Sequence, residues 1–355
     1  MNFKENLEDF RTRLDKEIKA FFDRTIKEAG KRDRFISEAL RIVRDNVLSG
    51  GKRIRPALMY WGYVGAGGKE KEKIFKTSIS IELIHSFLLI HDDIMDRDIT
   101  RHGRDTLNWA YEKIGKKIFK ASDPKHFGDS IALTVGDMVA ALGNQIIFES
   151  SFSPGLVMQA LSKLQDIISL TVIGQAKDIY MEYRGKSSEK EVLRMYEYKT
   201  ARYTLEGPLQ LGCILGGAPK GLLDSFSRIS VPLGIAFQIQ DDILGIFGAK
   251  EKIGKSVGSD IKEGKQTLLA VKALEMSGYK EKKRLRELLG NPDISFREVK
   301  EFRRIVSGSG ALAYAKDLAE SLIEKGKEEI DKAKMNVEAK EFLLGMADYM
   351  IERKY

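Results

Sequence analysis

Apolar residues recur along most of this chain at spacings of three and four, which is the period of one buried face of an α-helix. Residues 6–26 show the pattern first, because charged positions there alternate with an apolar stripe of Leu7, Phe10, Leu14, Ile18 and Phe22. The same pattern predicts helices over residues 35–47, 57–67, 74–94, 130–148, 156–181, 189–211, 221–247, 266–276 and 311–333. Glycine-rich and polar segments predict loops at residues 50–51, 121–128, 185–188 and 248–264.

The fold class follows from what this pattern lacks. Few segments alternate apolar and polar residues with β-branched enrichment, so we expect no significant sheet. Only 7 prolines occur in 355 residues, which favours long helices. No fixed-period repeat indicates a solenoid, and no Pro/Ser-rich linker divides the chain. The sequence therefore predicts a single all-α domain over residues 1–355, although chain length alone suggests about two domains.

Composition and charge narrow the function classes. Lys and Arg total 60 and Asp and Glu total 52, a formal charge of +8, but basic and acidic residues interleave as on solvated helix faces. We therefore expect no nucleic-acid partner. The N-terminal residues lack the apolar core of a secretory signal, and no uninterrupted apolar run approaches about 20 residues. The sequence thus predicts a cytoplasmic protein without a transmembrane segment.

Cysteine and histidine are scarce. Cys213 is the single cysteine and there are 4 histidines, which excludes a multi-cysteine zinc or iron–sulfur site. Any metal site must therefore rely on carboxylates, which suit magnesium, calcium or manganese better than zinc.

Aspartates gather at the ends of two predicted apolar helices. Helical spacing places Asp92 and Asp96 on one face, with Asp93 three positions before Asp96. A second pair, Asp241 and Asp242, ends the helix predicted over residues 221–247. One acidic run alone is usually a solvated helix end. Two runs in apolar surroundings indicate cations that compensate the charge, on opposite sides of one diphosphate.

Basic segments complement these aspartates. They are Gly50-Gly51-Lys52-Arg53-Ile54-Arg55-Pro56, Arg101-His102-Gly103-Arg104, Lys199-Thr200, Gly254-Lys255 and Gly264-Lys265. Arginine and lysine both suit phosphate oxygens. Singly each is ordinary surface charge, but together they predict one metal-bridged diphosphate and a second anion that is held by cations alone.

With these residues in view, the chain resembles the trans-prenyl diphosphate synthases, the family of short-chain isoprenyl diphosphate synthases, and is similar to its geranylgeranyl diphosphate synthases. The matching blocks stand in family order over about residues 35–269 and also include Gly136-Asp137, Gly174-Gln175, residues 237–242 and residues 258–268. The resemblance implies an isoprenoid-synthase-type all-α helical bundle around a deep central cavity, usually a homodimer.

The resemblance also implies a reaction. Magnesium, three ions per active site with manganese as the alternative, binds an allylic diphosphate, which ionises and is attacked by the double bond of isopentenyl diphosphate. The catalytic residues it implies are Asp92, Asp93, Asp96, Lys199, Asp241 and Asp242, and the metal ligands are Asp92, Asp96 and Asp241. The allylic diphosphate is expected at Arg101, Lys199, Thr200, Gln238, Lys255 and Lys265. Isopentenyl diphosphate is expected at Lys52, Arg55, His85 and His102.

Two positions depart from the family pattern. Gly245 stands where the second motif usually has its third aspartate, from which we expect reduced metal affinity and not inactivity. His102 replaces an arginine that normally helps to hold isopentenyl diphosphate, which weakens the expectation at that contact. The connection over residues 116–127 is longer than the family norm.

Product length is expected to depend on residues before Asp92. One helical turn rises about 5.4 Å, close to one isoprene unit. Phe87, Leu88, Ile84 and Ile81 lie five, four, eight and eleven positions before Asp92 and would form a ruler. One aromatic at Phe87 with a non-aromatic neighbour resembles archaeal-type geranylgeranyl synthases, which predicts a C20 product. Alternatives are a C15 farnesyl or longer-chain synthase, a cyclase or head-to-head synthase, a non-catalytic regulatory subunit, and an HD-type phosphohydrolase based on His91-Asp92.

Overall fold

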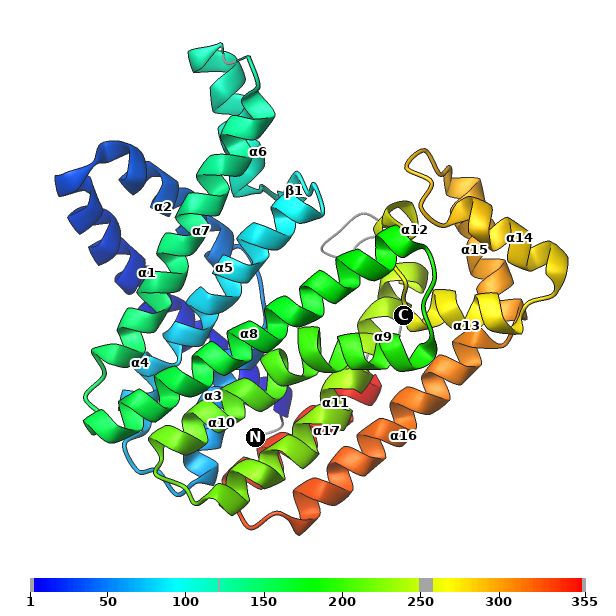
Figure 1. The fold of residues 1–355 in the computed structure, drawn as a ribbon. Coiled ribbons are helices and arrows are strands. Elements are labelled where there is room, and N and C mark those ends of the chain that lie inside the picture. Colours follow the sequence, from blue (N-terminus) through cyan, green and yellow to red (C-terminus); the bar gives the residue numbers. More distant parts are fainter. Residues whose placement is uncertain (1–2, 121, 249–257, 353–355) are drawn as a thin grey trace. The chain divides into compact units, whose positions relative to one another are not determined.

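The computed structural model describes residues 3–120, 122–248 and 258–352, whose regular secondary structure is helical apart from one short hairpin (Figure 1). The predicted all-α class is confirmed. In the first half the elements are α1 (Phe3–Arg32), α2 (Arg34–Leu48), α3 (Ile54–Gly65), α4 (Lys71–Thr77), α5 (Ile79–Met95), β1 (Thr100–Arg101), β2 (Arg104–Asp105), α6 (Leu107–Ile114), the π-helix η1 (Gly115–Phe119), α7 (Pro124–Phe148) and α8 (Pro154–Arg184).

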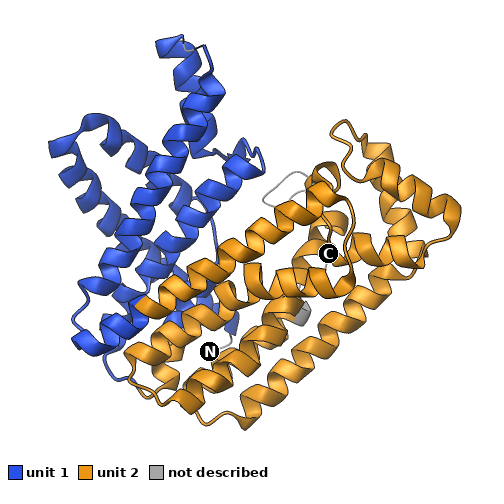
Figure 2. Cartoon of the chain, viewed as in Figure 1, with its two compact units in different colours: residues 1–60, 68–161 blue, residues 61–67, 162–355 orange. Residues whose placement is uncertain are grey.

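The second half continues with α9 (Glu189–Tyr196), the π-helix η2 (Glu197–Glu206), α10 (Gly207–Leu215), α11 (Lys220–Phe247), α12 (Ser259–Glu263), α13 (Leu268–Met276), α14 (Tyr279–Leu288), α15 (Phe296–Gly308), α16 (Ala311–Lys332) and α17 (Val337–Glu352). Contacts between residues divide the whole chain into two compact units (Figure 2). Unit 1 contains residues 1–60 and 68–161, and unit 2 contains residues 61–67 and 162–355. The single domain over residues 1–355 stays a prediction.

Unit 1 is built on helix pairs that the apolar stripes create. The predicted stripe of α1 is buried, and α1 packs on α2, while α7 packs on both α5 and α6. Gly143 lets α5 and α7 approach closely, because a Cβ atom there would lie 3.1 Å from the Ser80 carbonyl oxygen and 3.0 Å from the Ile84 side chain. This close packing fixes the direction of α5, which carries the first aspartate cluster.

Two sequence predictions in unit 1 need correction. The helix predicted over residues 74–94 is two helices, since Ser78 ends α4 and begins α5, with its hydroxyl donating to the Phe75 carbonyl oxygen at 2.6 Å. The loop predicted over residues 121–128 is wrong from Pro124 onward, where α7 begins. Asp123 caps that helix by accepting from the His126 N–H at 3.0 Å, and proline suits the first helical position because its missing N–H has no helical partner there.

Unit 2 is organised around α11, which packs on α16 and on η2. The helix predicted over residues 189–211 is α9, η2 and α10 in succession, and the middle segment has the wider π turn. Ser188 and Glu191 form a capping box that starts α9. The sequence patterns missed α6, α12, α14, α15 and α17. Of these, α12 lies within the loop predicted over residues 248–264, and α15 has a clear buried stripe of Val299, Phe302, Ile305 and Val306.

Four helical stretches are long and apolar enough to cross a membrane by length and composition alone: Lys71–Met95, Pro124–Phe148, Pro154–Arg184 and Lys220–Phe247. Polar and charged residues interrupt these stretches, so none of them is a continuous apolar run. The first and last bury 67% and 61% of their most apolar window inside the chain, against 33% and 28% for the other two. The absence of a transmembrane segment stays a prediction.

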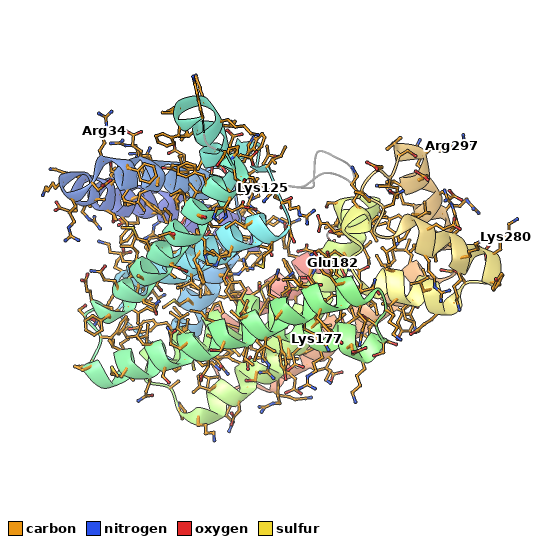
Figure 3. The ribbon with its side chains drawn as sticks, turned by 45° about the horizontal axis from the view of Figure 1, so that its top comes forward. Arg34, Lys125, Lys177, Glu182, Lys280 and Arg297 are labelled. Carbon is orange, nitrogen blue, oxygen red and sulfur yellow. The ribbon has the colours of Figure 1, made fainter. Side chains whose placement is uncertain are left out.

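Charged side chains cover the outer faces of the helices. Arg34, Lys280 and Arg297 are exposed and extend away from the ribbon (Figure 3). Neighbouring turns pair opposite charges, as Lys19 does with Asp23 at 2.7 Å. Such exposed pairs contribute little to stability, because water and salt screen them, so the interleaved charges serve solvation more than stability.

Candidate active site

The first aspartate cluster lies at the C-terminal end of α5, in unit 1. The N–H of Asp96 donates to the Asp92 carbonyl oxygen at 2.8 Å, so these two residues are one helical turn apart, as their spacing predicts. Both are half-buried, whereas Asp93 is only 5% exposed. The helix therefore presents two of its three carboxylates to solvent and turns the third inward.

Arg101 is the partner of the inward carboxylate. Its Nε and Nη2 atoms lie 2.8 and 2.5 Å from Oδ1 of Asp93, and Nη2 lies 3.4 Å from Asp98. Burial raises the pKa of Asp93 to about 6, although Arg101 opposes this shift. The predicted allylic-diphosphate ligand Arg101 thus holds the end of α5 together, and Asp98 is a partner that the sequence analysis missed.

A two-residue hairpin carries Arg101 and His102. Arg101 pairs with Arg104 across it, and the turn between them consists of His102 and Gly103, with φ of 50° and 76°. Two central residues of positive φ are typical of the tight turn that matches the strand twist. His102 lies against Gly50, where a Cβ atom would be 2.8 Å from the imidazole ring. Burial and Arg101 lower the pKa of His102, so its ring is neutral at pH 7.

The three basic residues of the turn before α3 differ in burial and in their contacts. Arg53 has a φ of 53° and is 4% exposed. It lies 2.7 Å from both Asp15 and Glu82 and donates to the Val47 carbonyl oxygen at 2.6 Å. Lys52 is exposed and Arg55 is half-buried. The buried Arg53 therefore stabilises the turn, which leaves its two basic neighbours as the accessible cations.

Arg55 contacts another predicted ligand of isopentenyl diphosphate. Its Nη1 atom lies 3.1 Å from Nε2 of His85. Because a guanidinium has only donors, Nε2 accepts and the ring proton is assigned to Nδ1. Burial, and next the Arg55 charge, lower the pKa of His85 well below its ordinary value. His85 is therefore a neutral residue that orients Arg55.

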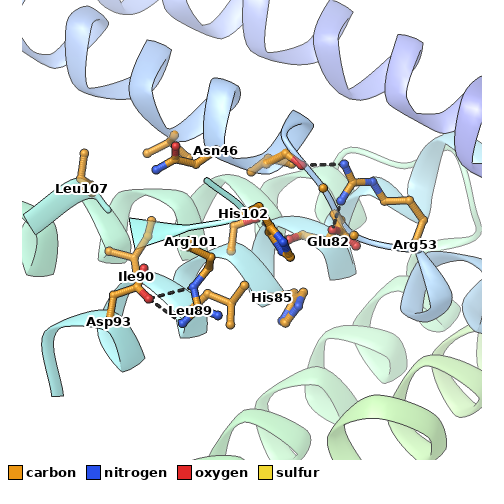
Figure 4. A pocket seen from close by; sticks show the side chains of 15 residues that line it. Asn46, Arg53, Glu82, His85, Leu89, Ile90, Asp93, Arg101, His102 and Leu107 are labelled. Atoms are coloured by element: carbon orange, nitrogen blue, oxygen red, sulfur yellow. Dashed lines mark hydrogen bonds and ion pairs between the residues drawn. The ribbon is translucent and has the colours of Figure 1, made fainter. Parts of the chain in front are cut away.

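A pocket in unit 1 joins these elements (Figure 4). It is lined by α2, the turn at residues 50–53, α5 and the hairpin, and it brings together Arg101, His85 and His102. Figure 4 shows Arg53 bonded to Glu82 on one side and Arg101 bonded to Asp93 on the other. Lys52 and Arg55 are not among its lining residues.

The second aspartate cluster lies on α11, in unit 2. As in the first cluster, one aspartate is buried and another is half-buried. Asp241 is half-buried and Asp242 is buried. Gln238 donates to Oδ1 of Asp242 at 2.8 Å, and the Tyr196 hydroxyl donates to Oδ2. Burial raises the pKa of Asp242 well above its ordinary value. Both oxygens of Asp242 are therefore engaged within the protein.

The same network reaches two further predicted or neighbouring residues. The Thr200 hydroxyl donates to Oε1 of Gln238 at 2.6 Å, and the N–H of Leu268 donates to the Tyr196 hydroxyl at 2.8 Å. This links η2 and the start of α13 to α11. Tyr196 gave no signal in the sequence, since it carries no charge and stands in an ordinary helical pattern.

A buried aspartate on α8 contacts two lysines of unit 2 that are predicted ligands of the allylic diphosphate. Lys199 Nζ lies 2.6 Å from Oδ2 of Asp178, and Lys265 Nζ lies 3.8 Å from the same atom and 3.1 Å from Glu182. In the sequence, the only indication of a role for Asp178 is that it lies three positions after the Gly174-Gln175 block. Gly174 permits the close approach, because a Cβ atom there would lie 2.4 Å from the backbone nitrogen of Lys199. Predicted ligand Lys255 lies outside the described residues.

The four residues predicted to determine product length differ in burial. Ile81 and Ile84 are fully buried, and Ile84 faces Gly143 of α7, which is ordinary packing. Phe87 and Leu88 are half-buried and retain accessible surface. The Phe87 ring meets the His91 ring edge-on at 4.7 Å, and His91 in turn lies 3.1 Å from the Leu133 carbonyl oxygen. His91 thus packs between helices, and no ring of histidines surrounds Asp92 in the described part of the chain.

The donor set fits magnesium. Within residues 3–120, 122–248 and 258–352, no three His, Cys, Asp or Glu side chains are already gathered as a metal cage. Magnesium does not need one, because it usually binds one or two carboxylates together with waters and substrate phosphates. Asp92, Asp96 and Asp241 are the half-buried carboxylates of the two clusters and supply the hard oxygen ligands that it prefers. Their role as metal ligands stays a prediction.

Comparisons with known proteins identify the family of this chain. The sequence profile described as "Polyprenyl synthetase" matches residues 37–306. Geranylgeranyl diphosphate synthase of Methanosarcina mazei is 33% identical over 86% of this chain and 87% of its own length. Geranylfarnesyl diphosphate synthase of Aeropyrum pernix is 31% identical over 90% and 95%. The crystal structure of geranylgeranyl pyrophosphate synthase from Corynebacterium glutamicum, complexed with isoprenyl diphosphate and magnesium, matches with a TM-score of 0.92, at 29% identity over 98% of this chain and 99% of that one.

Proposed function

The chain belongs to the polyprenyl synthetase family and is a prenyltransferase of that family, and from this premise we propose that it joins isopentenyl diphosphate head to tail to an allylic diphosphate and makes C20 geranylgeranyl diphosphate. The observation that carries the proposal is the burial of the aspartates. In each cluster one aspartate is buried and hydrogen-bonded, whereas Asp92, Asp96 and Asp241 are half-buried and retain accessible surface.

We propose that these three carboxylates hold magnesium. When bound, the metal supplies positive charge that neutralises the diphosphate and assists its departure. The relative from Corynebacterium glutamicum was crystallised with magnesium and isoprenyl diphosphate, which supports this assignment.

The cations of the chain are then available for the diphosphates. Lys199 and Lys265 would exchange the Asp178 carboxylate for phosphate oxygens, which are acceptors of the same kind. Their positive charge stabilises the negative charge that develops on the leaving group. Lys52, Arg55 and the neutral His85 would hold isopentenyl diphosphate without metal, with His102 beside them in place of the usual arginine.

The proposed product length has its support in Phe87. It is the half-buried aromatic one to two turns before Asp92, where a growing chain would meet it. The two relatives above carry names with different chain lengths, geranylgeranyl and geranylfarnesyl, so similarity alone leaves C15, C20 and longer products as alternatives.

We also propose that the enzyme is a cytoplasmic homodimer. Large apolar side chains remain exposed on α7 and α8, among them Leu133, Phe148, Met158, Val172 and Ile173. Exposed apolar side chains in such number are typical of a protein-protein contact. Sedimentation equilibrium of the purified chain tests this state.

The decisive experiment incubates the purified chain with Mg²⁺, isopentenyl diphosphate and each allylic diphosphate in turn and measures product length. We expect a C20 product. Asp92→Ala and Asp241→Ala should abolish turnover with an unchanged melting temperature, whereas Asp317→Ala, at an exposed position of α16, should have no effect. Absence of condensation with every allylic diphosphate would refute the proposed reaction. An unchanged rate in Asp92→Ala and Asp241→Ala would refute their roles as metal ligands.

A further inference from the structure

The missing third aspartate of the second cluster has a neighbour in space. Gly245 lies four positions after Asp241, hence on the same face of α11. A Cβ atom built on Gly245 would lie 2.9 Å from Oδ2 and 3.9 Å from Cγ of Asp260. The Asp260 carboxylate therefore occupies the space in which a side chain at position 245 would begin.

The short helix α12 holds Asp260 in this place. Gly258 and Gly264, with φ of 86° and 78°, flank the helix at its start and end, and its residue Ile261 is buried. The Lys265 N–H donates to the Asp260 carbonyl oxygen at 2.9 Å. The Gly290 N–H donates to the Ile261 carbonyl oxygen at 2.8 Å. Because α12 also packs on α11, the position of its backbone is determined at both ends.

The second cluster needs such a contribution. Both carboxylate oxygens of Asp242 accept hydrogen bonds, from Gln238 and from Tyr196, so this residue is engaged inside the protein. From α11 alone, Asp241 is then the accessible carboxylate of the cluster. Asp260 brings a second one from a different helix.

We propose that Asp260 takes over the function of the absent aspartate at position 245, so that the second cluster consists of Asp241 and Asp260. This inference rests on the proposed function, since it concerns the magnesium of that site. A carboxylate here can bind the metal or accept a hydrogen bond from its water ligands, and either contact fixes the ion. The expectation of weakened metal affinity from Gly245 is thereby revised to near-normal affinity.

Two pairs of variants test it. Asp260→Asn removes the charge and keeps the shape, and Asp224→Asn, at an exposed position of α11, is its control. Gly245→Ala adds the methyl group that displaces the carboxylate while Asp260 stays present. Its control is Gly221→Ala on the same helix, where a Cβ atom has no neighbour within 4 Å. The double variant Gly245→Asp/Asp260→Asn moves the charge back to α11.

The readout is the Mg²⁺ concentration that gives half of the rise in melting temperature at a fixed concentration of inorganic diphosphate, which needs no turnover. Loss of a carboxylate that supports a metal typically costs about 10- to 100-fold in metal affinity. We expect Asp260→Asn and Gly245→Ala to raise the half-maximal Mg²⁺ concentration by that factor, both controls to leave it unchanged, and the double variant to restore it.

The inference is overturned if Asp260→Asn behaves as Asp224→Asn does, or if the double variant binds Mg²⁺ no better than Asp260→Asn. Should Asp260→Asn fail to fold, Gly245→Ala decides alone, because it leaves the carboxylate in the chain. The condensation assay on the unmodified chain separates the two proposals: no product there ends the proposed function, whereas product with metal-insensitive variants ends only the role of Asp260.

Discussion

The ammonium nitrogen of Lys199 lies 2.6 Å from a carboxylate oxygen of Asp178, which is 5% exposed. A cation predicted to bind the allylic diphosphate is thus held by a buried carboxylate outside both aspartate clusters. Lys265 approaches the same oxygen to 3.8 Å. A diphosphate that binds here must compete with Asp178 for two lysines.

Asp178→Asn therefore has two measurable consequences. We expect the free energy of unfolding to fall by about 1–3 kcal/mol, because the buried charged partner of Lys199 is lost. Inorganic diphosphate should then raise the melting temperature more than in the unmodified chain, since its oxygens no longer compete with a carboxylate. Asp166→Asn, exposed on the same helix, is the control. An equal or smaller rise in Asp178→Asn would show that Lys199 does not contact the anion.

The basic turn offers a test that separates structure from binding. Arg53→Met leaves Glu82 buried without its cation, which typically costs about 3–5 kcal/mol. Lys52→Ala, at the adjacent exposed position, should change the free energy of unfolding by less than about 0.5 kcal/mol. It should instead raise the KM for isopentenyl diphosphate. Urea unfolding and steady-state kinetics measure the two effects, and similar stabilities of the two variants would contradict the assignment.

Helices with strong apolar stripes could be predicted from sequence, because burial of one face is a local property of the pattern. The α1 stripe is an example. The π-helix over residues 197–206 could not, since so short a wider segment leaves the apolar spacing nearly unchanged. Which aspartate of each adjacent pair turns inward was equally hidden. It depends on Arg101 in one cluster and on Tyr196, 46 positions from Asp242, in the other.

His85 should make stability depend on pH. Burial and Arg55 lower its folded-state pKa below the ordinary value of about 6.5, so the unfolded chain takes up the proton first as pH falls. Its contribution is therefore complete above about pH 6.5 and is lost below it, by at most about 1.4 kcal/mol per pH unit.

His85→Asn removes this dependence. The difference in the free energy of unfolding between the unmodified chain and His85→Asn should shrink as pH falls from 7 to about 5, measured by urea titration at each pH. Taking the difference cancels the contribution of Asp93, whose pKa is raised to about 6 and which acts in the opposite direction. His126→Asn, at an exposed position, is the control. A difference that stays constant with pH would refute a neutral His85.

Phe87 should limit the length of the product. Its ring is fixed edge-on against His91 at 4.7 Å, and His91 has no room to move toward α7, because a Cβ atom on Gly136 would already lie 2.6 Å from its Nε2 atom. His91 therefore supports the Phe87 ring on one side, and removing the ring opens about one helical turn, 5.4 Å, or close to one isoprene unit.

Phe87→Ala should therefore shift the product from C20 toward C25, seen by thin-layer chromatography of labelled products after dephosphorylation. Phe87→Trp keeps an aromatic ring and should yield no longer products. Because Phe87 is half-buried, we expect Phe87→Ala to cost less than the about 3–5 kcal/mol of a core phenylalanine, so the variant remains folded for assay. Phe296→Ala removes an exposed aromatic from α15 and serves as the control. Identical product lengths in Phe87→Ala and Phe296→Ala would show that Phe87 serves packing alone and that other residues determine chain length.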